Sequence, residues 1–222
     1  MRTRILDIET GPLEQAKEWL AEEPITAPSH YKDPEKIASY IAKAEAERAE
    51  RFALDPDLAR IVALGWHDIS SEPIVHLCSN EFEEREGLKL FWQSYASGGE
   101  TRFITFFGHT FDLPMLVLRS LYLDVPHPHV SFFPSYKAYP HKDLAEVLGL
   151  YGARRGVKSL AFYCRKFGID SFDDVSGKDI GALVADGSRE AWEKIHNHCL
   201  SDLTLTQALA ERLKVLPKTA VA

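Results

Sequence analysis

The sequence predicts an α/β fold with a mixed five-stranded sheet flanked by helices. Two observations support this class. Residues 60–70 and 73–78 read as strands separated by a Ser-Glu-Pro turn signal, which favours an antiparallel hairpin. Beyond them, strand and helix patterns alternate, as in sheets whose strands are connected through covering helices. With 222 residues, we expect one domain over 1–222.

The first strand is expected at residues 5–10, Ile-Leu-Asp-Ile-Glu-Thr. Side chains alternate along a strand, so Asp7 and Glu9 share one face with Ile5. Two acids on so apolar a stretch are costly to bury unpaired, and a divalent cation would relieve their repulsion. An edge strand whose acids face water explains this stretch equally well.

The next segment, about 11–57, is expected to be a helical insertion between the first two strands. Helical periodicity appears at 14–23 and at 35–52, with prolines between them. Its charges are typical of a solvated flank, and a lid over a cleft is the functional alternative.

The remaining elements follow in order. A helix is expected from an N-cap at Asn80 to about residue 96, with Phe82, Leu88, Leu90 and Phe91 available to the core. Further segments are a strand at 102–107, a helix at 115–123, a short strand near 136–141, two short helices at 143–150 and 158–167, a small helix, a long helix at about 188–213 and a frayed tail at about 215–222.

Composition narrows the class of protein. The chain is 45% hydrophobic and 27% charged, and its net charge of -7 argues against coating nucleic acid by bulk electrostatics. The three cysteines lack zinc-type spacing, and their odd number argues against a disulfide framework and favours a reducing, cytoplasmic location. No apolar run approaches membrane-spanning length, and we expect no signal peptide, no membrane contact and no protein partner.

Two further acids stand out. Asp112 precedes a helix, where an N-cap is its ordinary role, although Thr110 could cap equally well. Asp202 lies within an apolar stripe of the last helix, so it needs a cation or a basic partner. His198 lies four residues earlier on the same face, and a His198–Asp202 ion pair is a structural alternative.

Together, Asp7, Glu9, Asp112 and Asp202 form a possible oxygen-ligand set for Mg²⁺ or Mn²⁺. Two such ions, about 3.5–4 Å apart, can activate water and stabilise the leaving oxygen in phosphodiester hydrolysis. His198 has the chemistry of a general base near neutral pH.

Three runs carry a resemblance: Asp-Ile-Glu-Thr at 7–10, Phe-Asp-Leu-Pro at 111–114 and His-Cys-Leu-Ser-Asp at 198–202. They resemble the motifs of the DEDD 3′–5′ exonucleases, and most narrowly the predicted exonucleases related to the proofreading domain of family B DNA polymerases. The resemblance implies a ribonuclease H-like fold in which the four acids hold two metal ions.

The sequence departs from that pattern twice. His198 stands four residues before Asp202, where one branch of the family has tyrosine. Phe107 stands five residues before Asp112, where the polymerase-like pattern usually has asparagine. The first departure concerns the group that orients or deprotonates the attacking water, and the second concerns a contact to substrate.

A basic segment is the expected binding surface for a phosphate backbone. Residues 137–166 carry a net charge of +5, with Arg154 and Arg155 in a glycine-flanked loop and Lys158 close behind. Phe111 is the expected base-stacking residue, and Thr10 is a further expected substrate contact.

The expected function is therefore metal-dependent 3′–5′ exonuclease activity on single-stranded nucleic acid, with DNA favoured over RNA on resemblance alone. Two alternatives remain: a catalytically impaired nucleic-acid-binding module of the same fold, and a hydrolase of short oligonucleotides.

Overall fold

The computed structural model describes residues 2–21, 24–128, 141–171 and 173–216. Its sheet has the strand order β3-β2-β1-β4-β5. β1 is antiparallel to β2 and parallel to β4, which confirms the expected mixed five-stranded α/β fold. The first strand lies at the centre of the sheet, so the edge-strand alternative for its acids does not hold. The strands are β1 (Arg2–Pro12), β2 (Ala59–Asp68), β3 (Ile74–Leu77), β4 (Thr101–Thr105) and β5 (His141–Asp143).

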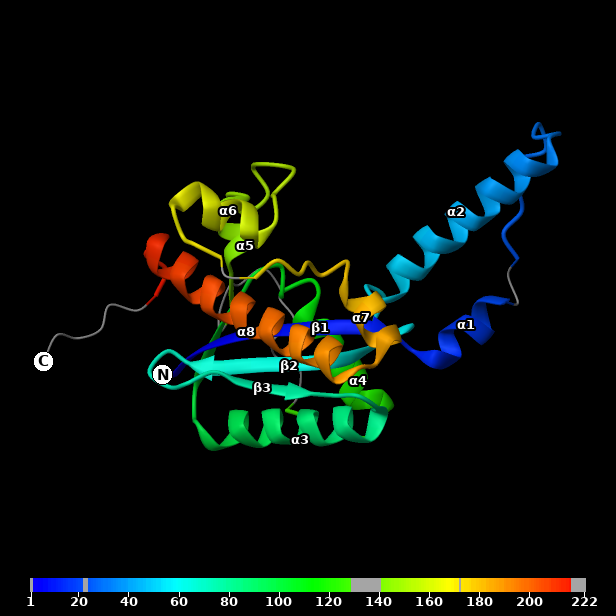
Figure 1. Cartoon of the computed structure of the whole chain (residues 1–222). Coiled ribbons are helices and arrows are strands. Elements are labelled where there is room, and N and C mark those ends of the chain that lie inside the picture. The colour runs from blue at the N-terminus through cyan, green and yellow to red at the C-terminus, as the bar shows by residue number, and fades with distance from the viewer. Residues whose placement is uncertain (1, 22–23, 129–140, 172, 217–222) are drawn as a thin grey trace, which may run out of the picture.

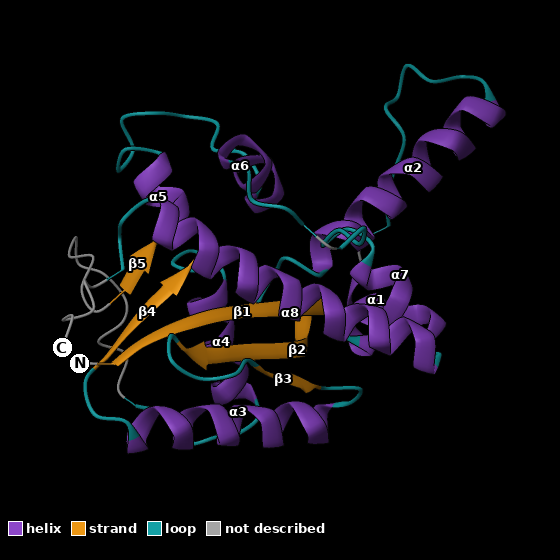
Figure 2. Ribbon diagram, turned by 60° about the vertical axis from the view of Figure 1, so that its left-hand side comes forward, coloured by secondary structure: helices purple, strands orange, loops and turns teal. Residues whose placement is uncertain are grey.

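The two faces of β1 pack against different helices. Leu6 and Ile8 lie in one core cluster, with side chains of α3 (Glu81–Ser97) and α4 (Asp112–Tyr122). Ile5 lies in another, with side chains of α8 (Arg189–Arg212). Figure 2 shows α8 along one side of the sheet and α3 along the other. Asp7 and Glu9, in alternation with Leu6 and Ile8, are thereby turned towards α8.

β1 is longer than predicted. It continues past a register shift between Glu9 and Thr10, and beyond the shift Thr10 pairs with Ile61 of β2. Such a bulge bends a strand and re-aims its side chains, and bulges are frequent beside functional sites.

α3 begins as expected, because the side chain of Asn80 accepts a hydrogen bond from the Glu83 N–H. Leu88 and Phe91 are buried, but the prediction that Phe82 and Leu90 join the core is wrong. Each lies two residues from a buried position, about 200° around the helix, and therefore faces solvent.

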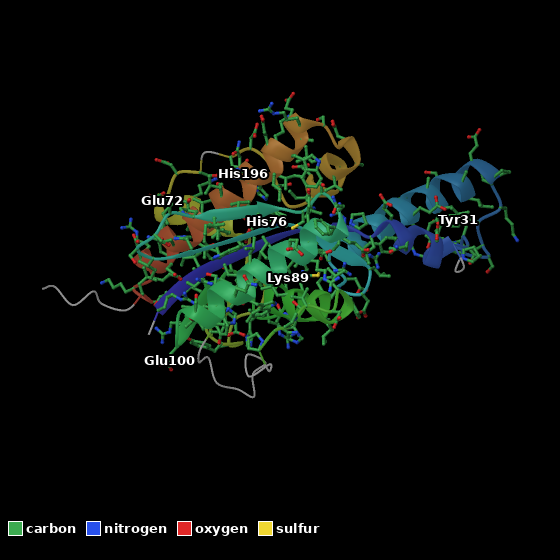
Figure 3. The ribbon with its side chains drawn as sticks, turned by 90° about the horizontal axis from the view of Figure 1, so that it is seen from below. Tyr31, Glu72, His76, Lys89, Glu100 and His196 are labelled. Atoms are coloured by element: carbon green, nitrogen blue, oxygen red, sulfur yellow. The ribbon has the colours of Figure 1, made fainter. Side chains whose placement is uncertain are left out.

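Two helices lie between β1 and β2, as predicted: α1 (Glu14–Ala21) and α2 (Pro34–Phe52). α2 projects away from the sheet (Figure 1), and Tyr31, which precedes it, lies far from Lys89 on α3 (Figure 3). The base of this arm packs through Leu13, Ala16 and Phe52. Its exposed surface agrees with a solvated flank.

The last elements are short helices followed by α8. They are α5 (Leu144–Leu148), α6 (Leu160–Phe167) and α7 (Ile180–Asp186). Of the strand expected near 136–141, only residue 141 lies in β5; residues 129–140 lie outside the described residues. The prediction of fraying at 215–216 is wrong, because Val215 and Leu216 pack against a core cluster that includes α8, and the rest of the expected tail, 217–222, lies outside the described residues. Within the described residues, no helix is long and apolar enough to span a membrane.

Candidate functional site

Asp7 and Glu9 lie beside α8 near the middle of the sheet. A carboxylate oxygen from each, together with the Sγ of Cys199, all lie within 4.8 Å of one another. The thiol of Cys199 donates to the backbone carbonyl of Asp7 at 3.9 Å. Burial raises the pKa of Cys199 well above its usual range, so this side chain stays a neutral thiol. The oxygens of the two acids are the candidate ligands.

A glycine on β2 sets the approach of α8. Gly65 pairs with Asp7 across the β1–β2 ladder. A Cβ atom at this position would meet Cys199 Sγ at 2.6 Å and Leu203 Cδ1 at 2.8 Å. The missing side chain therefore lets α8 lie directly against the strand that carries the acids.

Asp112 is the first residue of α4, and its side chain does not cap the helix. The N-cap position belongs to Phe111, which makes no side-chain cap bond. Asp112 is buried, and backbone N–H groups, its own and that of Ile8, stabilise its charged form. Burial and then Asp143 nevertheless raise its pKa to about 8. The ordinary N-cap alternative does not apply to this residue.

The carboxyl groups from three segments of the chain act on one another. Burial raises the pKa of Asp7 well above its usual range, and Glu9, Asp202 and Asp112 raise it further. Glu9 shows the same pattern, with burial first and then Asp202 and Asp112. Burial also raises the pKa of Asp202 on α8. Asp112 and Asp202 thus lie close enough to act on Asp7 and Glu9 electrostatically. Among the described residues, neither belongs to the tighter group whose ligand atoms lie within 4.8 Å of one another.

This cluster has the character of a site for a hard cation. The Oδ2 atom of Asp7 is buried and makes no hydrogen bond within the described residues. An unpartnered buried carboxylate oxygen is costly, and a divalent ion would supply its partner while relieving the repulsion among the acids. The donor set of carboxylate oxygens suits Mg²⁺ or Mn²⁺.

His198 faces the same cluster from α8. Its Nδ1–H donates to Oδ2 of Asp173, and its Nε2 lies 3.7 Å from Oε1 of Glu9. Among the described residues, the carboxylates within 4 Å of its ring nitrogens are those of Asp173 and Glu9, and the His198–Asp202 ion pair is not formed.

Sequence reasoning missed Asp173. It lies in the connection before α7, where it is followed by a second acid, Asp174. Asp173 is only 11% exposed, whereas Asp174 is exposed. An acid in a polar loop carries no periodicity, so only the tertiary structure reveals its partner.

Asp143 is a second residue that the sequence analysis missed. Its two carboxylate oxygens accept the N–H groups of Phe107 at 3.0 Å, His109 at 3.1 Å and Ala145 at 2.8 Å. One side chain thus caps α5 and fixes the connection between β4 and α4. Its position immediately before a helix was the available signal.

Phe107, in this connection, has a left-handed backbone with φ +62° and a side chain that is 43% exposed. This conformation costs a residue other than glycine on the order of 1–3 kcal/mol. Asparagine tolerates it better, because its side chain can form local hydrogen bonds.

The residues expected to bind substrate lie in different surroundings. The Thr10 hydroxyl is buried and donates to the Ala53 carbonyl, which ties β1 to the end of α2. Phe111 is partly buried against the core cluster on the α3 side. Arg154, Arg155 and Lys158 are all exposed. Their contacts with substrate stay predictions.

Most of the chain matches a known protein family in sequence. Residues 54–218 match a family described as a predicted 3′-5′ exonuclease related to the exonuclease domain of PolB. The matched range contains Asp112, His198 and Asp202, whereas Asp7 and Glu9 precede it. A comparison with curated proteins found no match.

Among solved structures, the chain is similar to the family B DNA polymerase from the hyperthermophilic archaeon Pyrobaculum calidifontis. The TM-score is 0.64 at 17% sequence identity, over 96% of this chain and 24% of the polymerase chain. The chain thus spans about a quarter of the polymerase, and the likeness shows the fold alone. Because the family match covers most of its length, the chain belongs to the predicted 3′–5′ exonucleases related to the exonuclease domain of PolB.

Proposed function

We propose that the protein is a metal-dependent 3′–5′ exonuclease that releases nucleoside monophosphates from single-stranded nucleic acid, with DNA favoured over RNA. The observation that carries this proposal is the convergence of four acids from β1, α4 and α8 on one buried place with an unpartnered oxygen. Such a cluster is unfavourable for folding, so a role in binding cations explains why the chain contains it.

Asp7, Glu9, Asp112 and Asp202 would hold two Mg²⁺ or Mn²⁺ ions. When bound, such ions supply an activated water and stabilise the leaving oxygen of a phosphodiester. The protein's part is to orient the four carboxylates and shield them from bulk water. Because burial raises their pKa values, the bound cations would be what keeps them ionised.

His198 would orient or deprotonate the attacking water. In the neutral tautomer that donates its Nδ1–H to Asp173, the Nε2 lone pair faces the Glu9 side of the cluster and can accept a proton. The imidazole thereby takes the place that the family's tyrosine pattern gives to a phenol.

The exposed bases of the Arg154 loop would contact the phosphate backbone of the substrate. Arg154, Arg155 and Lys158 are free of ion pairs with acids in the described part of the chain. Thr10 and Phe111 remain proposed contacts closer to the acids. Backbone contacts carry no sequence information, which suits hydrolysis from a strand end.

The test is cleavage of oligonucleotides labelled at the 3′ or the 5′ end, with Mg²⁺, Mn²⁺ or EDTA. We expect 3′-labelled strands to lose their label at once as a mononucleotide, and 5′-labelled strands to shorten stepwise, only with metal. Asp202→Asn should abolish both patterns, while Asp174→Asn, at an exposed acid, should not.

Strand binding without shortening in any metal would contradict the exonuclease and support the impaired binding module, for which His198 in the tyrosine position is the favouring observation. Shortening of dinucleotides and trinucleotides alone would support the hydrolase of short oligonucleotides.

A further inference from the structure

Two exposed phenylalanines are the outer members of two ring pairs. Phe107 lies edge-on to Phe106, with centroids 5.0 Å apart, and Phe162 lies edge-on to Tyr163, with centroids 5.3 Å apart. In each pair the inner ring is more deeply packed, whereas Phe107 and Phe162 are 43% and 45% exposed.

The inner rings join the pairs across the fold. Phe106, at the end of β4, lies 6.3 Å from Tyr163 on α6. Four rings therefore form a row that runs from the β4–α4 connection to the surface of α6. We call Phe106, Phe107, Phe162 and Tyr163 the aromatic row.

One end of the aromatic row lies on the loop that leads to the acids. Phe107 precedes Asp112 by five residues, and its N–H is held by the carboxylate of Asp143. The Phe107 carbonyl in turn accepts the N–H and the hydroxyl of Thr110, both at 3.2 Å. The exposed ring is thus presented by a loop with fixed backbone contacts.

The row also contacts the basic loop. The hydroxyl of Tyr163 accepts a hydrogen bond from Nη1 of Arg154 at 2.9 Å and one from the backbone N–H of Lys158 at 3.4 Å. The exposed Arg154 therefore lies beside the inner end of the ring pair on α6, so the aromatic row and the basic loop are in direct contact.

Folding alone does not account for the placement of Phe107. Its ring is exposed, and its backbone is left-handed, a conformation that an aromatic residue adopts only at a cost. Because Phe106 already packs against the core cluster, the fold gains little from a second ring. A strained, exposed aromatic beside a candidate active site is a signature of ligand contact.

We propose that Phe107 and Phe162 stack bases of the single-stranded substrate, with Arg154 contacting its backbone between them. This rests on the proposed exonuclease function, which places the 3′ end at the acids. Phe107 then stacks a base next to the scissile bond, and Phe162 stacks one about three to five nucleotides upstream, at roughly 3.4 Å per nucleotide. Base stacking on aromatic rings is tolerant of sequence.

The first experiment measures the Kd of a labelled single-stranded oligonucleotide in EDTA by fluorescence anisotropy, and KM and kcat with Mn²⁺. Phe107→Asn and Phe162→Ala should each raise Kd and KM at least about fivefold, with little change in kcat. Phe82→Ala is the matched control, since Phe82 is 73% exposed on α3, on the opposite side of the sheet.

Phe107→Asn also separates a binding role from a structural one. Asparagine suits a left-handed backbone, so we expect an unchanged or raised melting temperature alongside the weaker binding. For Phe162, shortening the substrate below about three nucleotides should remove the difference between wild type and Phe162→Ala.

A second experiment uses strands with abasic sites at the two 3′-terminal positions. Wild type should bind these strands more weakly than normal strands. Phe107→Asn should bind normal and abasic strands with the same Kd. If Phe107→Asn weakened binding by the same factor on normal and abasic strands, stacking would be overturned. Wild-type Kd and KM in both Phe107→Asn and Phe162→Ala would overturn it as well.

The two proposals can fail separately. Stepwise cleavage with unaltered binding by the phenylalanine variants would refute the strand path and leave the exonuclease intact. Weakened binding by these variants, with no cleavage by wild type in any metal, would refute the exonuclease and leave the stacking surface intact.

Discussion

The carboxyl group of Asp7 is surrounded by other acids, so its charge has opposite effects on folding and on cation binding. In Asp7→Asn the shape is kept, and one negative charge is removed from a buried cluster. We expect cleavage with Mn²⁺ to fall at least about a hundredfold. The free energy of unfolding in EDTA should stay level or rise, measured by chemical denaturation. A near-normal cleavage rate would remove Asp7 from the site.

The pair formed by His198 and Asp173 gives a second prediction. His198→Ala should lower kcat about 10²–10⁴-fold, as expected for loss of a general base. Asp173→Asn should give a smaller loss, because the ring loses an ionised partner for Nδ1 but stays in place. Asp174→Asn is the control.

A double-mutant cycle tests whether Asp173 acts through His198. In a His198→Tyr background, where no Nδ1 exists, Asp173→Asn should cost no activity. An undiminished cost in that background would mean that Asp173 acts independently of the ring.

Among individual residues, the sequence identified those that interrupt a regular pattern of apolar or β-forming residues. Asp7 and Glu9 were visible because acids interrupted a β-forming run, and Asp202 because it interrupted an apolar helical stripe. Asp173 and Asp143 could not be identified from the sequence, because their roles depend on the distant backbone groups and the histidine ring that they contact. Phe107 was noticed only as a departure from a motif, because a left-handed φ cannot be read from periodicity.

At the level of elements, the distance between α8 and the sheet depends on one missing side chain. Gly65→Ala places a methyl group against Cys199 and Leu203. We expect a loss of about 1–3 kcal/mol in stability, as for other overpacked interiors. Cleavage should also fall, because displacement of α8 moves Asp202 and His198 relative to Asp7.

Gly177→Ala provides the matched control, since a Cβ there meets nothing within 4 Å and the backbone is not left-handed. Both variants are compared by thermal melting and by kcat. Equal melting temperatures for the two variants would show that α8 tolerates the shift.

Most elements were predictable from sequence because caps and periodicity are local. Asn80 as an N-cap and the long C-terminal helix are examples. The buried positions of α3 were less predictable, because hydrophobic residues occur on both of its sides and only the sheet determines which side is buried. The continuation of β1 to Pro12 depends on pairing with β2 across a bulge, which no local signal contains.

For the whole molecule, the acid cluster couples folding to pH and to cations. Asp112 has an ordinary pKa of 3.8 and a folded-state pKa of about 8, and the pKa values of Asp7, Glu9 and Asp202 are also raised. Between these values the folded state keeps protons that the unfolded state has released. Without metal, stability is therefore greatest at the acidic end of this window and declines as pH rises through it.

We thus expect the melting temperature in EDTA to fall between about pH 5 and pH 8. Mn²⁺ should raise it more at pH 8 than at pH 5, because the ion competes with protons for the same oxygens. Asp112→Asn should flatten the pH dependence in EDTA. A melting temperature in EDTA that rises over this range would contradict the raised pKa values.

The contact between Cys199 and Asp7 joins residues 192 positions apart. The central strand therefore leaves the ribosome long before the helix that completes its acidic face. Contacts of such sequence separation form slowly, because a long loop must close before they do. A nascent or truncated chain that lacks α8 would hold only part of the acid cluster, so the proposed cation site should form only after α8 has been synthesised.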